Sequence, residues 1–170
     1  NIPDLSPLNK SILSIKKYLQ KHQTIIIESS TYPGTTNKIF NTYLKKRFNL
    51  GNDFYLGYSP EREDPGNKHF KISNTPKIVS GYTENCLKIV NLFYKSIVKK
   101  THIVSSLEVA EFTKLYENTY RNINIALANE AKMICEKLNL NIFEIVEAAK
   151  TKPFGFHAFY PGPGIGGHCI

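Results

Sequence analysis

The chain has 170 residues, of which 41% are hydrophobic, and its formal net charge is +8 at pH 7. This apolar content is typical of a globular protein, and the length fits one domain or slightly more than one. No apolar run is long enough to span a membrane, and no signal-peptide pattern opens the chain, so we expect neither a membrane protein nor a secreted one.

The positive charges are dispersed along the chain. They form only short clusters, at Lys16-Lys17, Lys45-Lys46-Arg47 and Lys99-Lys100. A nucleic-acid-binding protein usually concentrates its charge on one face, together with aromatic or arginine readers. We therefore interpret the clusters as solvated helix surfaces and expect no nucleic-acid partner, although the positive excess suits an anionic small molecule.

The chain contains three cysteines. Cys86 and Cys135 lie in predicted amphipathic helices and are expected to pack in the core. An odd number of cysteines without regular spacing argues against a disulfide framework and indicates a reducing compartment, the cytoplasm. No metal-ligand spacing is present, because His168 beside Cys169 lacks the further partners of a tetrahedral site.

Strands and helices alternate through the first hundred residues. This alternation predicts an α/β fold with a parallel, doubly wound sheet. Right-handed crossovers would then place the carboxyl ends of all strands at one edge, where such sheets bind ligands. In chain order, the predicted elements are a helix over 9–21, a strand over 24–28, a helix from the turn at Pro33-Gly34 to about residue 48, a strand over 54–58, a polar loop over 59–76, a strand over 77–80, a helix from Thr83 to about residue 98 and a strand over 102–104.

At Ser105 the pattern changes from sheet to helix. Ser105 and Glu108 form a capping box, and helical periodicity continues to about residue 138. Asn141 and Glu144 form a second capping box, which opens a short helix to about residue 149. We therefore predict a sheet domain over 1–105 and a helical domain over 106–170.

The long predicted helix carries a polar stripe. Lys114, Asn118 and Arg121 have the spacing i, i+4, i+7 and so share one face. Three donor side chains without a carboxylate suit an oxyanion or a phosphate. The alternative interpretation is an ordinary solvent-exposed face.

Two polar segments directly follow predicted strands. Glu61 and Arg62 follow one strand, and the hydroxyl residues Ser29, Ser30 and Thr31 follow another. The carboxyl end of a parallel strand favours a functional role, such as contact with a cofactor. The hydroxyl residues have an alternative role as caps of the next helix.

The last ten residues form a loop around Cys169. Four glycines and two prolines occur in seven residues, which excludes a helix or a strand and leaves the thiol accessible. Such a thiol is a candidate nucleophile, whereas the alternative is a plain turn beside a packed cysteine. Gly162, Gly164 and Gly167 match a dinucleotide-binding fingerprint, but without a preceding strand and a following helix we reject it.

Four segments together resemble one family. The segments 28–36, 59–66, 110–121 and 161–170 occur in the order and at the separations found in the UDP-glucose/GDP-mannose dehydrogenase family. The resemblance covers essentially the whole chain and is nearest to the branch that oxidises UDP-N-acetylhexosamines. It implies a four-electron oxidation of the sugar C6 alcohol to a carboxylate with NAD, without release of the aldehyde, for surface polysaccharide biosynthesis.

The resemblance also implies an architecture. Members have two Rossmann-like domains joined by a long central helix, which forms the contact of a homodimer. The chain is similar to the back half of the first domain, followed by the central helix. We therefore expect a glycine-rich NAD loop upstream and a nucleotide-sugar domain downstream, and we expect the isolated chain to be inactive.

Residue roles follow from matching positions. Cys169 matches the thiol that takes up the aldehyde, Lys114 and Asn118 match the pair that stabilises the oxyanion, and Glu61 matches the carboxylate near the hydrolytic water. Ser30 lies where the family usually has a threonine beside the nicotinamide. The positions that match substrate contacts are Arg62, Arg121, Phe159, Tyr160, Gly162 and Gly166.

The segment 151–156 bears on the choice of sugar. The UDP-N-acetylmannosamine enzymes tend to have histidine and arginine at the positions of Pro153 and Gly155, and the segment instead resembles the UDP-N-acetylglucosamine type. We therefore expect a UDP-N-acetylglucosamine 6-dehydrogenase. UDP-N-acetylmannosamine and UDP-glucose are the alternative substrates, and a non-catalytic dimerisation fragment is the alternative class.

Overall fold

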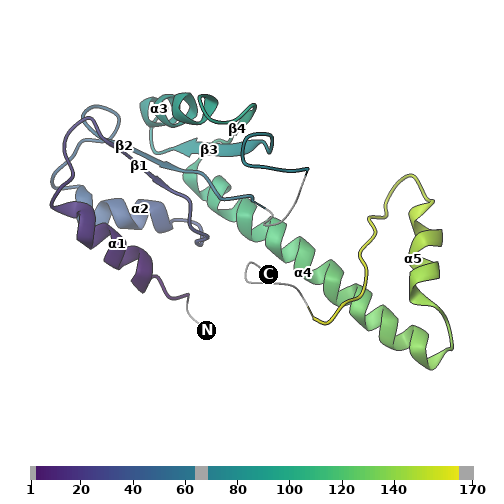
Figure 1. The fold of residues 1–170 in the computed structure, drawn as a ribbon. Helices are drawn as coiled ribbons and strands as arrows, with labels where there is room; N and C mark the ends of the chain where they lie inside the picture. The colour runs from purple at the N-terminus through teal and green to yellow at the C-terminus, as the bar shows by residue number, and fades with distance from the viewer. Residues whose placement is uncertain (1–2, 64–68, 165–170) are drawn as a thin grey trace. The chain divides into compact units, whose positions relative to one another are not determined.

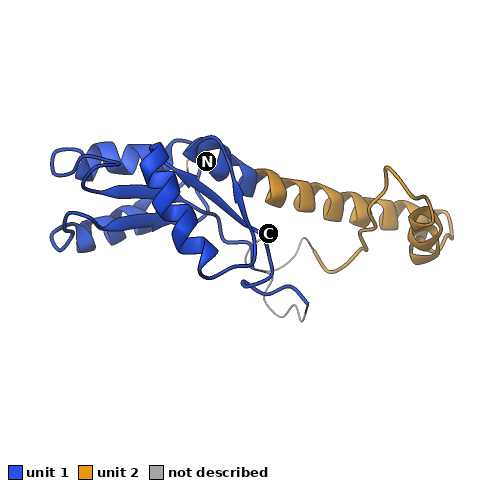
Figure 2. Cartoon of the chain, turned by 90° about the horizontal axis from the view of Figure 1, so that it is seen from above, with its two compact units in different colours: residues 1–115 blue, residues 116–170 orange. Residues whose placement is uncertain are grey.

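The computed structural model describes residues 3–63 and 69–164. The chain divides into two compact units, residues 1–115 and 116–170 (Figure 2). The predicted boundary near residue 105 stays a prediction. The elements are α1 Ser6–Lys16, β1 Thr24–Ile27, α2 Thr35–Ile39, a π-helical turn over Phe40–Leu44, β2 Tyr55–Tyr58, β3 Lys77–Gly81, α3 Glu84–Lys95, β4 Thr101–Ile103, α4 Leu107–Lys137 and α5 Ile142–Lys150.

The first unit is built around a four-stranded sheet in the order β1-β2-β3-β4 (Figure 1). The pairs β1–β2 and β3–β4 are parallel, as predicted. The pair β2–β3 is antiparallel, with Tyr58 opposite Ser80, so the expectation that all carboxyl ends share one edge is wrong. A parallel pair needs a crossover connection, usually a helix, and the described residues between β2 and β3 contain no helix.

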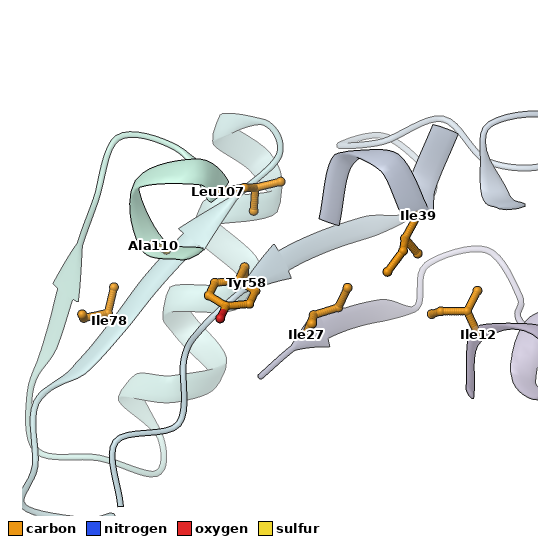
Figure 3. Packing of buried hydrophobic residues seen from close by; sticks show 7 residues of the cluster. All are labelled: Ile12, Ile27, Ile39, Tyr58, Ile78, Leu107 and Ala110. Atoms are coloured by element: carbon orange, nitrogen blue, oxygen red, sulfur yellow. The ribbon is translucent and has the colours of Figure 1, made fainter. Parts of the chain in front are cut away.

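Helices cover both faces of this sheet. On one face, α1, α2 and the first turns of α4 pack on Ile27, Tyr58 and Ile78, as Figure 3 shows. On the other face, α3 packs on Ile26 and Val79. Neighbouring strand residues point to opposite faces, which explains why the strands are apolar without alternation. The α/β fold class predicted from the sequence is thereby confirmed.

The helix α3 lies very close to β2. A Cβ atom at Gly57 would lie 2.5 Å from a methyl carbon of Val90 and 2.7 Å from the carbonyl oxygen of Ser80. Only glycine therefore fits at this position of the strand. The close packing fixes α3, and with it the Tyr94 side chain, over the sheet.

Side-chain caps define three helix starts. Thr83 accepts the N–H of Cys86 at the start of α3, and Asn141 accepts that of Phe143 at the start of α5, as expected. At α4 the cap is Ser106, whose hydroxyl accepts the N–H of Val109, and not Ser105. The helix α1 also begins earlier than predicted, because Pro7 lies in its first turn, where proline is favoured.

The helix α4 is 31 residues long and is shared by the two units. Its length agrees with the unbroken periodicity of the sequence. No helix in the described part of the chain, α4 included, has the length and apolar character needed to cross a membrane.

Candidate functional site

An ion cluster lies just beyond the carboxyl ends of β1 and β2. The Lys77 ammonium is 2.8 Å from Glu28 Oε1 and 2.9 Å from Glu61 Oε2. The Lys77 side chain is only 6% exposed, whereas those of Glu28 and Glu61 are 47% and 45% exposed. Lys77 reaches this edge because β3 runs antiparallel to β2: the last residue of β2, Tyr58, pairs with Ser80, so the first residue of β3, Lys77, lies past the end of β2, beside the loop that carries Glu61. A buried ammonium thus joins two carboxylates that remain open to water.

The Glu61 carboxylate is held at both oxygens. While Oε2 accepts from Lys77, Oε1 accepts the backbone N–H groups of Arg62 and Glu63, each at 2.8 Å. Burial raises the pKa of Glu61, but Lys77 and the two N–H groups outweigh it, so the pKa lies below its ordinary value. Glu61 is therefore an ionised and oriented acceptor at neutral pH.

The partner carboxylate, Glu28, is oriented by α3. The Tyr94 hydroxyl donates to Glu28 Oε1 at 2.7 Å. Burial and the Glu28 carboxylate both raise the pKa of Tyr94 well above its ordinary value, so the hydroxyl keeps its proton. The Lys77 ammonium also lies 5.3 Å from the centre of the Tyr94 ring. Strands β1 and β3, helix α3 and the loop after β2 thus all contribute to one cluster.

The hydroxyl residues that follow β1 lie in the same unit. Ser29 and Ser30 are exposed, and the Ser29 carbonyl accepts the Tyr58 hydroxyl at 3.1 Å. Thr31 is 5% exposed and interacts with the Tyr58 hydroxyl, whose pKa burial raises to about 12.

Glu111 of α4 ties the helix to the same segment. Its carboxylate accepts the N–H of Gly34 at 2.6 Å, and the N–H and hydroxyl of Thr36 at 2.8 and 2.7 Å. The Glu111 side chain is fully buried. Its neighbour Glu108 accepts from the Asn37 amide. Glu111 was not predicted as a site residue from the sequence, since a single acidic residue in a helix is most often on the surface.

The polar stripe lies on α4, which is continuous across it. Lys114 and Asn118 are half-buried and one turn apart, and Arg121 is exposed. The i, i+4 spacing places Lys114 and Asn118 on the same side of the helix. Arg62, predicted to contact substrate, donates from its guanidinium to the Pro76 carbonyl at 2.9 Å.

In the second unit, the segment that follows α5 lies along α4. The Asn129 side chain accepts the N–H of Gly162 at 3.0 Å and donates to the carbonyl of Gly164 at 3.4 Å. The Phe159 ring packs edge-on against Tyr120, with the ring centres 6.0 Å apart, and the Tyr160 hydroxyl donates to Glu147. The amide of Asn129 thus bonds to both Gly162 and Gly164 of the returning segment.

A largely apolar cavity of about 470 Å³ lies within the second unit. Tyr120 and Leu127 of α4, Ile145 of α5, and Phe156 and Phe159 of the returning segment line it together with smaller residues.

The predicted site residues fall into two groups. Glu61, Arg62 and Ser30 lie at one end of the sheet in the first unit, and Phe159, Tyr160 and Gly162 lie beside α4 in the second. The stripe on α4 crosses from one unit to the other. Cys169 and Gly166 lie outside the described residues. Neither Lys77 nor Asn129 was found by sequence reasoning.

Two family profiles match this chain. Residues 1–98 match the UDP-glucose/GDP-mannose dehydrogenase family, NAD binding domain, and residues 108–170 match the central domain of the same family. The first match confirms the predicted cofactor, NAD.

Several relatives match over nearly the whole chain. A UDP-N-acetyl-D-glucosamine 6-dehydrogenase of Pseudomonas aeruginosa is 43% identical, covering 99% of this chain and 40% of the relative. A UDP-N-acetyl-D-mannosamine dehydrogenase of Methanocaldococcus jannaschii is 38% identical, covering 98% of this chain and 38% of the relative. The structure of UDP-D-ManNAc dehydrogenase from Pyrococcus horikoshii superimposes with a TM-score of 0.90 at 35% identity, covering 98% and 40% of the two chains. The chain therefore spans about 40% of the length of its relatives.

Proposed function

Because the chain belongs to the UDP-glucose/GDP-mannose dehydrogenase family, we propose that the whole protein oxidises the C6 alcohol of UDP-N-acetylglucosamine to a carboxylate with NAD. The observation that carries this proposal is the pair of profile matches, which together cover nearly all of the chain. The chain holds part of the cofactor domain and the central helix of such an enzyme. The proposed compartment is the cytoplasm, in keeping with the free thiols of Cys86 and Cys135.

The choice of UDP-N-acetylglucosamine as substrate depends on one short segment and on the names of the relatives. The segment 151–156, with Pro153 and Gly155, resembles the UDP-N-acetylglucosamine type, and a relative named for that substrate is 43% identical. Relatives named for UDP-N-acetylmannosamine are nearly as similar, at 38% identity in one case. UDP-N-acetylmannosamine is therefore the second candidate substrate, and Arg62, Arg121, Phe159, Tyr160, Gly162 and Gly166 are the proposed sugar contacts.

The proposed chemistry centres on Cys169. When bound, NAD supplies the hydride acceptor for both oxidations, with the Ser30 hydroxyl beside its nicotinamide. The Cys169 thiolate adds to the aldehyde carbon to give the oxyanion of a thiohemiacetal, and loss of a hydride from this oxyanion restores the carbon–oxygen double bond and gives a thioester. Lys114 and Asn118 donate to the oxyanion during addition. The aldehyde is never free, so no product escapes between the two steps.

Hydrolysis completes the cycle. Water adds to the thioester carbon, the carbon–sulfur bond breaks, and sulfur leaves as the thiolate while two protons pass to solvent. Glu61 is the proposed acceptor for the attacking water. This role suits an ionised carboxylate with 45% of its side chain exposed.

The whole protein is also proposed to be a homodimer through α4. Tyr116, Ile123, Leu127 and Ile134 share one side of this helix and are 59–64% exposed in the single chain. A row of large apolar side chains on one helix face is typical of an interface.

The whole protein tests the proposal directly. It is mixed with NAD and a limiting amount of UDP-N-acetylglucosamine, UDP-N-acetylmannosamine or UDP-glucose, and absorbance at 340 nm is followed. We expect about two NADH per molecule of UDP-N-acetylglucosamine, since each hydride transfer yields one. Two NADH with another sugar alone would reassign the substrate, and no NADH from a folded protein with any of them would favour a non-catalytic dimerisation role.

A further inference from the structure

The chemistry proposed above assigns a role to Glu61 but not to the buried lysine that holds it. We propose that Lys77 is a positioning residue, which fixes the Glu61 carboxylate as the acceptor for the water that hydrolyses the thioester. The inference rests on the proposed function and adds to it the group through which Glu61 is held.

The burial of Lys77 is the first argument. A lysine ammonium with 6% of its side chain exposed has lost most contact with water, so close polar partners must replace its hydration. Glu28 and Glu61 are those partners, at 2.8 and 2.9 Å. One carboxylate is enough to balance the charge of the ammonium. The stability of the fold therefore does not by itself account for the second carboxylate.

The backbone of Lys77 is itself held rigidly. Its N–H donates to the Lys100 carbonyl at 3.0 Å, and the residue pairs with Thr101 of β4. Glu28 also accepts a hydrogen bond from Tyr94, so this second partner of the ammonium is itself held in place. Rigid elements therefore place one ammonium proton on Glu61 Oε2.

The orientation of Glu61 has a chemical consequence. Lys77 and two backbone N–H groups occupy three acceptor directions of the carboxylate, and the exposed remainder can accept from one water. A carboxylate held in this way stays ionised to a lower pH than a free glutamate and has one acceptor direction left for water. Lys77 thus acts on the water through Glu61 and touches no reacting atom.

The pH dependence follows from the groups around Glu61. Burial raises the pKa of Glu61, whereas Lys77 from β3 and the backbone N–H groups of Arg62 and Glu63 lower it, and Tyr94 of α3 stays neutral. Among the described residues, the other ionisable side chains around it are Glu28 after β1, which faces the same ammonium, and Arg62 and Glu63 in the loop itself. Removing the ammonium leaves burial, which raises the pKa of Glu61, opposed by the two backbone N–H groups, so the pKa rises. Glu61 then protonates at a higher pH.

The test compares Lys77→Met with Lys77→Arg in the whole protein, using the sugar that gives two NADH in the wild type. For Lys77→Met we expect a burst of NADH followed by a steady rate at least tenfold slower, with the acyl-enzyme visible by intact mass. The acid limb of the kcat profile should move to higher pH. Lys77→Arg keeps a cation at this position and should restore the wild-type steady rate and the wild-type acid limb. Lys100→Met, at an exposed lysine nearby, is the control and should behave as wild type.

The outcomes separate the two proposals. A wild-type protein without NADH production overturns the proposed function, and the Lys77 inference with it. A wild type that gives two NADH, beside a folded Lys77→Met with neither a burst nor a shifted pH profile, overturns the Lys77 inference alone. If Lys77→Met does not fold, Glu28→Gln/Lys77→Met removes a carboxylate with the cation and should show the same burst. Failure of both to fold would assign Lys77 to stability and overturn its positioning role.

Discussion

The carboxylate of Glu111 accepts both the N–H and the hydroxyl of Thr36, at 2.8 and 2.7 Å, although the two residues lie 75 positions apart. This contact joins the first turns of α4 to the first turn of α2, and the same carboxylate accepts the N–H of Gly34 in the segment that connects β1 to α2. Ser30 lies in that segment, and Lys114 lies one turn after Glu111 on α4. The contact therefore links the proposed cofactor segment to the proposed oxyanion stripe through a single buried side chain.

Glu111→Gln should loosen this link. The amide keeps the shape of the side chain, but its NH2 group faces N–H donors and cannot accept from them, a loss of about 2 kcal/mol. Hydrogen exchange in the whole protein should therefore be roughly 30-fold faster at residues 34–36, since 1.4 kcal/mol corresponds to a factor of ten. Glu130→Gln, at an exposed position of α4, is the control. Unchanged exchange at 34–36 in Glu111→Gln would show that the contact contributes little.

Lys114→Ala tests the oxyanion role. We expect kcat to fall by about 10²-fold or more, because a donor aimed at a developing oxyanion acts mainly in the transition state. Lys137→Ala, in the last turn of the same helix, should leave kcat unchanged. If Lys114→Ala raises only KM, Lys114 binds the substrate and does not serve the oxyanion.

Cys169→Ser tests the nucleophile. A serine hydroxyl without an activating base is a poor nucleophile at neutral pH, so thioester formation and the second NADH should be lost. Intact mass measurement during turnover would show no acyl adduct. Cys135→Ala removes a thiol packed among Ile142 and Val146 and should still turn over. Full NADH yield from Cys169→Ser would remove Cys169 from the mechanism.

The sequence predicted where the strands lie in the chain, but not that β3 runs antiparallel to β2. The apolar runs at 24–28 and 77–80 became β1 and β3, because short buried strands are rich in isoleucine and valine. The direction of β3 depends on its connection to β2, and no periodicity encodes that. For the same reason the partners of Lys77 were missed, since Glu28 and Glu61 meet it only through the antiparallel pairing.

Glu111 and Asn129 were not predicted from the sequence, and the reason is the same for both. Glu111 and Asn129 are helical residues whose partners, Thr36 and Gly162, are distant in the sequence. In a helix pattern, each looks like an ordinary surface position. The burial of Glu111 could have been suspected, because it directly follows Ala110, which packs in the core with Leu107. The sequence around Asn129 offers no such signal.

Ile123→Glu tests the proposed dimer. Ile123 and Leu127 are 62% and 64% exposed in the single chain, and burial of such side chains against a second copy contributes about 1.5–3 kcal/mol each. A charge at Ile123 would appear twice in a symmetric interface, so the whole protein should become monomeric at micromolar concentration in sedimentation analysis. Lys132→Ala, on the opposite side of α4, should remain dimeric. A wild-type protein that is already monomeric would rule out this interface.

Asn129→Ala tests how α4 controls the loop that carries Cys169. The substitution removes the acceptor of the Gly162 N–H and the donor to the Gly164 carbonyl, so the loop loses two fixed points five to seven residues before the thiol. A misplacement of about 1 Å can lower the rate by about 10²-fold, so kcat should fall strongly while α4 remains folded. Asn124→Ala, which removes a bond to the Tyr120 carbonyl within the helix, is the matched control. The rate of Cys169 alkylation should change with kcat, because both depend on the placement of the same sulfur. A normal kcat in Asn129→Ala would mean that the loop is positioned by other contacts.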